Sequence, residues 1–204
     1  MNLQEYKVLL LVVTAILALL VASPALQRLL VYPQTEFFTE MWLLGPEHKA
    51  ENFPFNITSN TNYNIFLGLG NHLGSCAYYS IQVKFRNQTQ PAADSFARTA
   101  SSLSPLHSIT ALVADKGMWE SPLTFSFAYT YSEDPVNATF SKVKVNSIVL
   151  NGATLHLEGF SANWDPERNG FFAYLFFELW FYSDVTGGFQ YHERYTSLRF
   201  NMTV

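Results

Sequence analysis

The chain begins with one long apolar segment and continues with alternating apolar and polar positions. Residues 8–31 are dominated by Leu, Val and Ala, and Arg28 is their only charge. As a helix, this segment would be about 36 Å long at ~1.5 Å per residue. A bilayer core of roughly 30 Å needs about 20 such residues. The pattern predicts a transmembrane anchor at residues 8–31, after a cytoplasmic tip at residues 1–7 and before an extracellular domain at residues 32–204.

A cleaved signal peptide is the alternative for this segment. Small residues within 22–25 are typical of a cleavage site. However, the apolar run resumes after Pro24, and a membrane helix tolerates a proline. Tyr6 and Tyr32 flank the run as interfacial aromatic residues do. These features favour a retained anchor over cleavage.

Period-two alternation after residue 32 predicts a β domain. Residues 77–86, 123–131 and 171–182 each place apolar side chains on alternate positions, as a strand with one buried face does. In residues 77–86 the second face is polar and is expected to be wet. Segments 87–108 and 161–170 are rich in Ser, Asn, Asp and Pro, and they are predicted loops.

Two local signals specify strand pairing. Asn151-Gly152 is the strongest two-residue hairpin signal in the chain, and the apolar pattern around it predicts that Leu150 pairs with Ala153. In the last strand, a change of apolar phase predicts a bulge or break near residues 193–196. Seven to nine strands with regular turns predict an all-β fold. The expected form is an immunoglobulin-like antiparallel β-sandwich preceded by one transmembrane helix.

Composition narrows the class of partner. The net charge is -4 and charged residues make up 14% of the chain, so no basic footprint for nucleic acid is present. Cys76 is the single cysteine and cannot form an intramolecular disulfide. Free cysteine is among the most buried residue types, so Cys76 is expected in the core. The predicted partners are therefore the lipid bilayer, other cell-envelope proteins or copies of the chain itself, and glycans as a further possibility.

Four acceptor sequons are consistent with an extracellular domain. Each has the form Asn-x-Thr, and they begin at Asn56, Asn87, Asn137 and Asn201. These four asparagines are the glycosylation candidates. The alternative is that they are ordinary polar residues of turns.

The residues that carry most enzyme chemistry do not form a known pattern. None of the five histidines pairs with another at a metal-ligand spacing, and Cys76 has no second cysteine. Asp165, Glu167 and Glu178 could face one another as glycosidase carboxylates do. The alternative is that Glu178 pairs with an Arg or Tyr in the sheet and that residues 165–168 form a solvated turn. We therefore predict no catalytic residues, no cofactor, no metal site and no enzyme activity.

An aromatic face supplies the interaction candidates. Tyr174, Trp180 and Tyr182 share one face of the strand at 171–182, and Trp164 lies in the loop before it. Aromatic side chains of this kind bind sugar rings or protein partners. Alternatively, the domain's own loop at 87–108 covers this face.

Several segments together resemble a known family. They are residues 23–33, 35–46, 68–72, 83–87, 119–125 and 163–170. The chain resembles an archaeal group of uncharacterised membrane proteins, domain-of-unknown-function family 1616, over nearly its whole length from Ala22. The resemblance implies an archaeal cell-surface protein with a sandwich domain outside the membrane, and it implies no activity, substrate or site. Many members carry several membrane spans before this region, whereas this chain has one predicted span.

The expected function follows from these points. The first hypothesis is a single-pass cell-membrane protein whose extracellular domain binds other envelope proteins as a structural or accessory subunit. A glycan-binding module that uses the aromatic face is the second. The third is a pilin-like filament subunit with bundled N-terminal helices, although the chain lacks a charged-Gly processing site before the apolar run.

Overall fold

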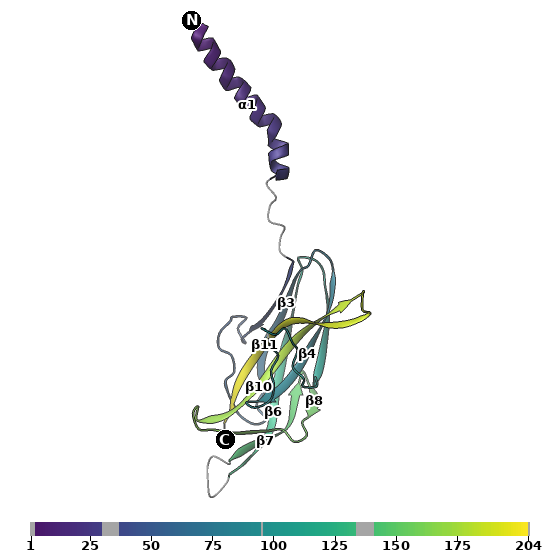
Figure 1. Ribbon diagram of the computed structural model, residues 1–204. Helices are drawn as coiled ribbons and strands as arrows, with labels where there is room; N and C mark the ends of the chain where they lie inside the picture. The colour runs from purple at the N-terminus through teal and green to yellow at the C-terminus, as the bar shows by residue number, and fades with distance from the viewer. Residues whose placement is uncertain (1–2, 30–36, 95, 134–140, 204) are drawn as a thin grey trace. The chain divides into compact units, whose positions relative to one another are not determined.

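Figure 1 presents the computed structural model of the protein, which describes residues 3–29, 37–94, 96–133 and 141–203. Within the N-terminal helix, side chains are described from Tyr6 to Ala22. The chain divides into two compact units, Met1–Phe37 and Phe38–Val204. The first contains one helix, and the second contains the strands.

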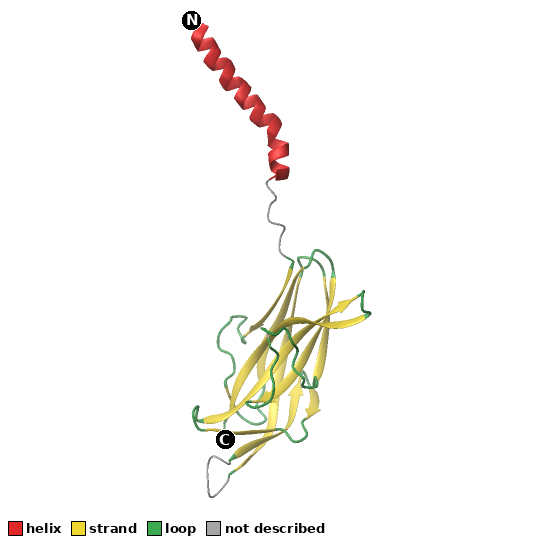
Figure 2. Ribbon diagram, viewed as in Figure 1, coloured by secondary structure: helices red, strands yellow, loops and turns green. Residues whose placement is uncertain are grey.

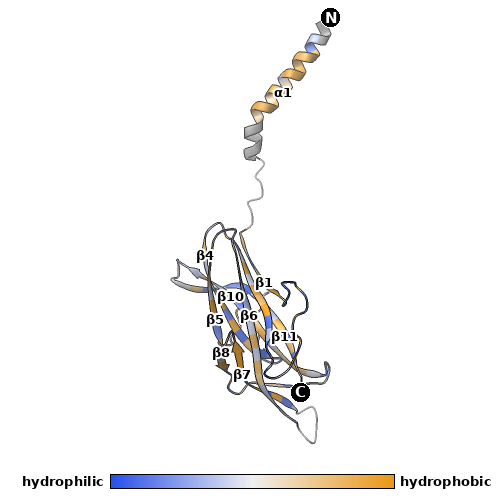
Figure 3. Cartoon of the chain, turned by 180° about the vertical axis from the view of Figure 1, so that it is seen from behind, coloured by the Kyte–Doolittle hydropathy of each residue, from blue (hydrophilic) through white to orange (hydrophobic). Residues whose placement is uncertain are grey.

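The helix α1 (Leu3–Leu29) presents apolar side chains on all sides of its described part. Its large hydrophobic residues between Val8 and Val21 are 47% to 76% exposed, and Figure 3 shows this stretch mostly in orange. Among the residues whose side chains are described, no helix has the length and hydropathy that crossing a membrane requires. The transmembrane anchor at residues 8–31 stays a prediction.

The described part of the second unit contains eleven strands, which is more than the seven to nine predicted (Figure 2). Their bounds are β1 (Phe38–Leu44), β2 (Asn56–Ile57), β3 (Tyr63–His72), β4 (Ala77–Asn87), β5 (His107–Val113), β6 (Met118–Ser132), β7 (Lys142–Leu150), β8 (Ala153–His156), β9 (Ser161–Asp165), β10 (Gly170–Ser183) and β11 (Gly188–Met202). The all-β class, with one N-terminal helix, is therefore confirmed.

The strands form one curled sheet. Eight of them follow the order β1-β3-β6-β7-β9-β10-β11-β2, while β4 pairs with β10, β5 with β4 and β8 with β7. Strand β9 joins the two halves because residues 161–163 pair with β7 and residues 164–165 pair with β10. This continuous path does not establish the immunoglobulin-like form of the sandwich. The prediction that residues 161–170 are a loop is wrong for β9, which pairs with β7 and, across a short turn, with β10.

Both local pairing signals are confirmed. Leu150 pairs with Ala153 across the Asn151-Gly152 turn, in the predicted register. Gly152 has a φ of 83°, a conformation that glycine adopts without steric cost. In the β10–β11 pair the register shifts after Leu179, which leaves His192 and Glu193 unpaired as a bulge. The bulge lies at the start of the predicted range.

The core fills the space between the two halves of the curled sheet. Phe200 of β11 contacts Phe125 and Phe127 of β6 at ring-centroid distances of 5.4 and 5.3 Å. Phe85 of β4 contacts Phe127 at 5.3 Å. These rings come from alternate positions of their strands, so one face of each half is apolar. The single cysteine is not part of this core: Cys76 is exposed, just before β4, and the prediction of a buried thiol is wrong.

The outer face of β4 and β10 carries a buried ion pair. Lys84 Nζ lies 2.7 Å from Glu178 Oε2, and both side chains are at most 2% exposed. Ser101, in the loop after β4, donates its backbone N–H to Glu178 Oε1 and accepts from Lys84 Nζ. The loop therefore covers this part of the face. The expectation of a wet face is wrong at Lys84, and the partner of Glu178 is a lysine, not an Arg or Tyr.

We expect Lys84→Met to destabilise the fold by about 3–5 kcal/mol, because it leaves the Glu178 carboxylate buried without its partner. The double variant Lys84→Met/Glu178→Leu should recover most of that loss, since it removes both charges. Urea unfolding of the three proteins measures these differences. As a control, Lys49→Met removes an exposed pair with Glu51 and should change the unfolding free energy by less than about 1 kcal/mol. Equal losses in the single and double variants would contradict this account.

Candidate functional site

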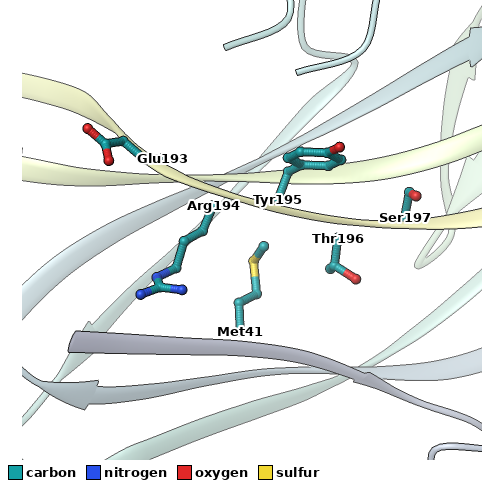
Figure 4. A pocket seen from close by; sticks show the side chains of 6 residues that line it. All are labelled: Met41, Glu193, Arg194, Tyr195, Thr196 and Ser197. Carbon is teal, nitrogen blue, oxygen red and sulfur yellow. The ribbon is translucent and has the colours of Figure 1, made fainter. Parts of the chain in front are cut away.

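The curled sheet leaves an open seam between the edges of β1 and β11. Among the described residues, β1 pairs only with β3, and β11 pairs only with β10 until its last two residues meet β2. A groove of about 540 Å³ lies between the two edges. Met41 of β1 and residues 193–197 of β11 line it (Figure 4). We call this groove the seam.

The side chains of the seam are mostly polar: Met41 is the aliphatic one, and Arg194 and Glu193 carry opposite charges. Figure 4 shows Met41 pointing from β1 toward β11, and Arg194 and Thr196 pointing from β11 toward β1. Arg194 and Thr196 pair with Leu179 and Phe177, so they share the inward face of β11. Arg194 is exposed and forms no ion pair with any residue that the structure describes.

A chain of hydrogen bonds closes one end of the seam. His192 Nε2 lies 2.8 Å from Thr39 Oγ1, which joins the bulge of β11 to β1. Thr39 Oγ1 lies 3.0 Å from the Tyr79 hydroxyl, and that hydroxyl donates to Asn71 Oδ1. Since each hydroxyl has one proton, the chain runs from His192 Nε2–H through Thr39 and Tyr79 to Asn71. At the other end, Asn201 donates its backbone N–H to Phe55 O.

The bulge histidine is held in its neutral form. Burial lowers the pKa of His192, because the charged ring would lose hydration, and the Arg194 guanidinium lowers it further. The Glu193 carboxylate opposes this shift. The neutral ring also packs at a tilt against Phe181, with centroids 4.9 Å apart. His192 therefore acts as a structural bridge between β1 and β11.

The chemistry that the seam offers is recognition of main chain. An unpaired strand edge presents a row of N–H and C=O groups that another strand can bind. Two such edges face each other here, with Met41 and Arg194 between them. Across the described residues, no group of three His, Cys, Asp or Glu side chains is placed to hold a metal ion. The two free strand edges are thus the feature of the seam that an added strand could bind.

The three carboxylates considered as a catalytic set have separate roles. Asp165 Oδ1 accepts the backbone N–H groups of Glu167 and Arg168, which makes a tight turn after β9. Glu178 is buried against Lys84 and Ser101. Glu167 is exposed in the turn.

The four interaction candidates do not form one open surface. The Arg86 guanidinium covers the Tyr174 ring, with its Cζ atom 4.1 Å from the ring centroid. Trp180 packs at a tilt against Tyr191, and its Nε1 is buried without a hydrogen-bond partner in the described structure. Trp164 packs edge-on against Phe171. Tyr182 is 41% exposed and the most accessible of the four.

The hydroxyl beside Trp180 is similarly isolated. The Tyr191 Oη atom is buried and has no hydrogen-bond partner among the described residues. Burial raises the pKa of Tyr191 to about 12, and the nearby Glu178 carboxylate adds to the shift. The phenol therefore stays protonated at physiological pH, and this pair of rings serves packing.

The sequon asparagines differ in whether their side-chain amides donate hydrogen bonds within the protein. Asn87 Nδ2 donates to Ser161 O, and Asn201 Nδ2 donates to Asn56 Oδ1. Asn56 is exposed, whereas Asn87 and Asn201 are half-buried. Asn137 lies outside the described residues. Of the three described candidates, Asn56 is the one whose Nδ2 is not a donor in a hydrogen bond of the described structure.

Comparison with known proteins places the chain in a family. Residues 33–138, just over half of the chain, match the family described as Domain of unknown function (DUF1616). The chain belongs to the DUF1616 family. This confirms the resemblance predicted from the sequence, while the archaeal source and the membrane location that it implied stay predictions. No curated protein and no solved structure matches the chain. The DUF1616 match spans β1 to β6, so β11, the second wall of the seam, lies beyond it.

The sequence alone did not predict the seam, although it predicted the bulge at one end of it. The phase change in the last strand predicted the bulge, and the bulge places His192 against Thr39. That β1 is the neighbouring edge could not be predicted, because β1 and β11 lie at opposite ends of the domain sequence.

We expect His192 to make stability depend on pH. The pKa of His192 is lower in the folded chain than its ordinary value of 6.5, so the unfolded chain takes up a proton first as the pH falls. Its contribution to stability is therefore complete above pH 6.5 and decreases below it. The difference in unfolding free energy between the natural chain and His192→Gln should shrink between pH 7.5 and 5. His156→Gln, on exposed β8, is the control; a pH-independent difference for His192→Gln would refute the expectation.

We expect glycans at Asn56 and none at Asn87 or Asn201. Attachment replaces one of the two Nδ2 hydrogens, and at Asn87 and Asn201 the sugar would have to fit beside the acceptor that Nδ2 already contacts, while Asn56 is open to solvent. Mass spectrometry of peptides from the protein purified from its own cells measures occupancy. The variant Asn56→Gln should lose the glycan mass, whereas Asn87→Gln should keep it. Occupancy at Asn87 or Asn201 would show that these hydrogen bonds do not protect their amides.

Proposed function

We propose that the chain is a membrane-anchored accessory protein of the cell surface, whose β domain binds an extended segment of another envelope protein in the seam. The observation that carries this proposal is the pair of unpaired strand edges that face each other across the groove. In this proposal the curled sheet is the extracellular sandwich domain, and the partner segment adds one strand between β1 and β11.

The seam is better suited to a strand than the other free edges are. Strands β5 and β8 also each have one edge without a partner among the described strands, but the groove described above lies between β1 and β11. In this proposal a strand in the seam forms hydrogen bonds on both sides, which requires β1 and β11 to stand apart by about twice the usual strand spacing of ~4.8 Å along the bound segment. Strand addition of this kind obtains affinity from main-chain bonds and specificity from alternate side chains. The two-sided arrangement therefore favours the seam.

The lining of the seam suggests the chemistry of the bound segment. About five residues can pair along 193–197, because a strand ladder matches residues one to one. The side chain opposite Arg194 should be a carboxylate, since this guanidinium has no ion pair in the described structure. Next to Met41 and Thr196, a small apolar side chain fits. The proposed partner segment is a short extended peptide whose alternate side chains face into the seam. Those inward side chains include one acidic and one apolar residue.

The membrane anchor is the second part of the proposal. It rests on the apolar run at residues 8–31 and on the exposure of the large side chains from Val8 to Val21. Exposed apolar surface of this extent is usually covered by lipid or protein. Insertion in the bilayer would cover it and would place the β domain at the cell surface.

The glycan-binding hypothesis has less support. A sugar site needs aromatic faces presented together, whereas the Tyr174 ring lies beneath Arg86 and the Trp180 nitrogen is buried. The filament hypothesis depends on contacts between helices of several copies. In the experiment below, an adduct with a second copy of the chain would favour that hypothesis.

A photoreactive phenylalanine derivative tests the seam directly. We expect its incorporation at Thr196, in native membranes, to give one discrete adduct with another envelope protein. Incorporation at Gln190, which is exposed on the same strand outside the seam, is the matched control and should give none. The crosslinked peptide should have the alternating sequence of a β-strand and contain an acidic residue. The variant Arg194→Glu should abolish the adduct, because its carboxylate would repel that residue.

Hydrogen exchange supplies an independent measurement. A synthetic peptide with the adduct sequence should slow amide exchange in β1 and in residues 193–197, because both edges gain partners. Exchange in β5, whose free edge is outside the seam, should not change. Strand addition would be refuted if incorporation at Thr196 and at Gln190 gave the same adducts. It would also be refuted if the peptide left amide exchange unchanged in both β1 and residues 193–197.

A further inference from the structure

Four exposed apolar side chains form a row across four adjacent strands. They are Leu112 of β5, Tyr78 of β4, Tyr182 of β10 and Phe189 of β11, and they are 38% to 70% exposed. Leu112 pairs with Tyr78, and Tyr182 pairs with Phe189. The Tyr78 ring lies 6.4 Å from Tyr182 and 5.3 Å from Phe189. We call this set the aromatic row.

The hairpin beyond the row extends the apolar surface. Val185 lies in the turn between β10 and β11 and is 95% exposed. One further residue pair, Ser183–Gly188, separates the Tyr182–Phe189 pair from the turn, so Val185 lies just beyond the row. In Figure 1 this hairpin, drawn in yellow-green, projects from the β domain. A large apolar residue at a projecting turn has no contact that would stabilise it in water.

The aromatic row lies at the end of the β domain where the chain enters it. The domain begins at Phe38, and Thr39 bonds to Tyr79, the residue next to Tyr78. Phe38 also stacks on His72, with ring centroids 4.6 Å apart. His72 ends the strand that turns into β4. Phe38 and the aromatic row are therefore on the same end of the sheet.

The length of chain before this end limits its distance from the predicted anchor. Phe38 is seven residues after Val31, and at ~3.3–3.6 Å per residue the chain between them can span about 25 Å at most. If residues 8–31 cross the bilayer, Phe38 lies within that distance of the interface. Tyrosine and phenylalanine rings favour the headgroup region, where one edge of the ring meets apolar chains and the hydroxyl meets water.

We propose that the aromatic row and Val185 rest on the lipid interface of the membrane in which the chain is anchored. This inference depends on the membrane anchoring in the proposed function, but it is independent of the seam. The contact orients the β domain: it directs the β10–β11 hairpin toward lipid and the far end of β10, at Gly170, away from it. The occupant of the row is a lipid surface and not a second protein.

The single cysteine gives a probe at the right position. Cys76 is exposed and lies two residues before Tyr78, so a fluorophore on its thiol reports on the row without any substitution. The full chain is reconstituted in phosphatidylcholine vesicles, some of whose lipids carry a quencher near the headgroup. The matched control is Cys76→Ser/Glu167→Cys, which moves the label to the turn between β9 and β10. This turn lies at the end of β10 that is far from the aromatic row.

We expect the Cys76 label to lose at least about half of its fluorescence in the quencher vesicles, because interfacial groups reach ~5–10 Å into the headgroup boundary. The label at position 167 should lose little. Tyr182→Ser/Phe189→Ser should reduce quenching at Cys76 to the level of that control. Tyr131→Ser, which removes an equally exposed ring beside Phe171, should not.

Vesicle flotation separates the two possible failures. If the chain does not float with the vesicles, both the anchor and the lipid contact are wrong. If the chain floats and the Cys76 label is quenched no more than the control label, the anchor stands and the lipid contact is wrong. Quenching that persists in Tyr182→Ser/Phe189→Ser would also overturn the assignment of the contact to the aromatic row.

Discussion

The aromatic core requires that the sheet curl until its two halves meet. Phe200 on β11 is buried against Phe125 and Phe127 on β6, across the two halves of the sheet, and burial of such rings is the main favourable term in folding. Strand β9 makes the turn possible, since it pairs with both halves. The curl also brings the last strand beside the first, and the seam is the geometric consequence of a closure that stops before β1 and β11 pair.

Buried polar groups specify this arrangement more than they stabilise it. The Lys84–Glu178 pair and the Thr39–His192 bridge each join strands that the apolar pattern alone could align in more than one way. A buried charge or hydroxyl costs free energy unless its partner is in place. The first pair fixes the loop after β4 over the outer face through Ser101. The second fixes the distance between β1 and β11 at one end of the seam.

The proposed functions use two surfaces of the same domain. The seam presents main-chain groups and Arg194 to an extended partner, and the aromatic row presents rings to lipid. Their separation matters, because a domain held to the membrane through one surface can offer the other to a partner in a defined orientation. Membership in the DUF1616 family covers β1 and most of the first half of the sheet, so the family region alone supplies only one wall of the seam.

Local features of the sequence were sufficient for the elements and for two of their pairings. Alternation predicted β4, β6 and β10, Asn151-Gly152 predicted its hairpin register, and the phase change near Glu193 predicted the bulge. These signals act between residues close in the sequence, where turn geometry and periodicity decide the outcome. Tertiary structure alone decided that Ser161–Asp165 is a strand, that Lys84 is buried with Glu178, that Cys76 is exposed, and that β1 faces β11. The Lys84–Glu178 pair and the facing of β1 and β11 depend on which distant strands become neighbours, and that choice follows from filling one shared core rather than from any local pattern.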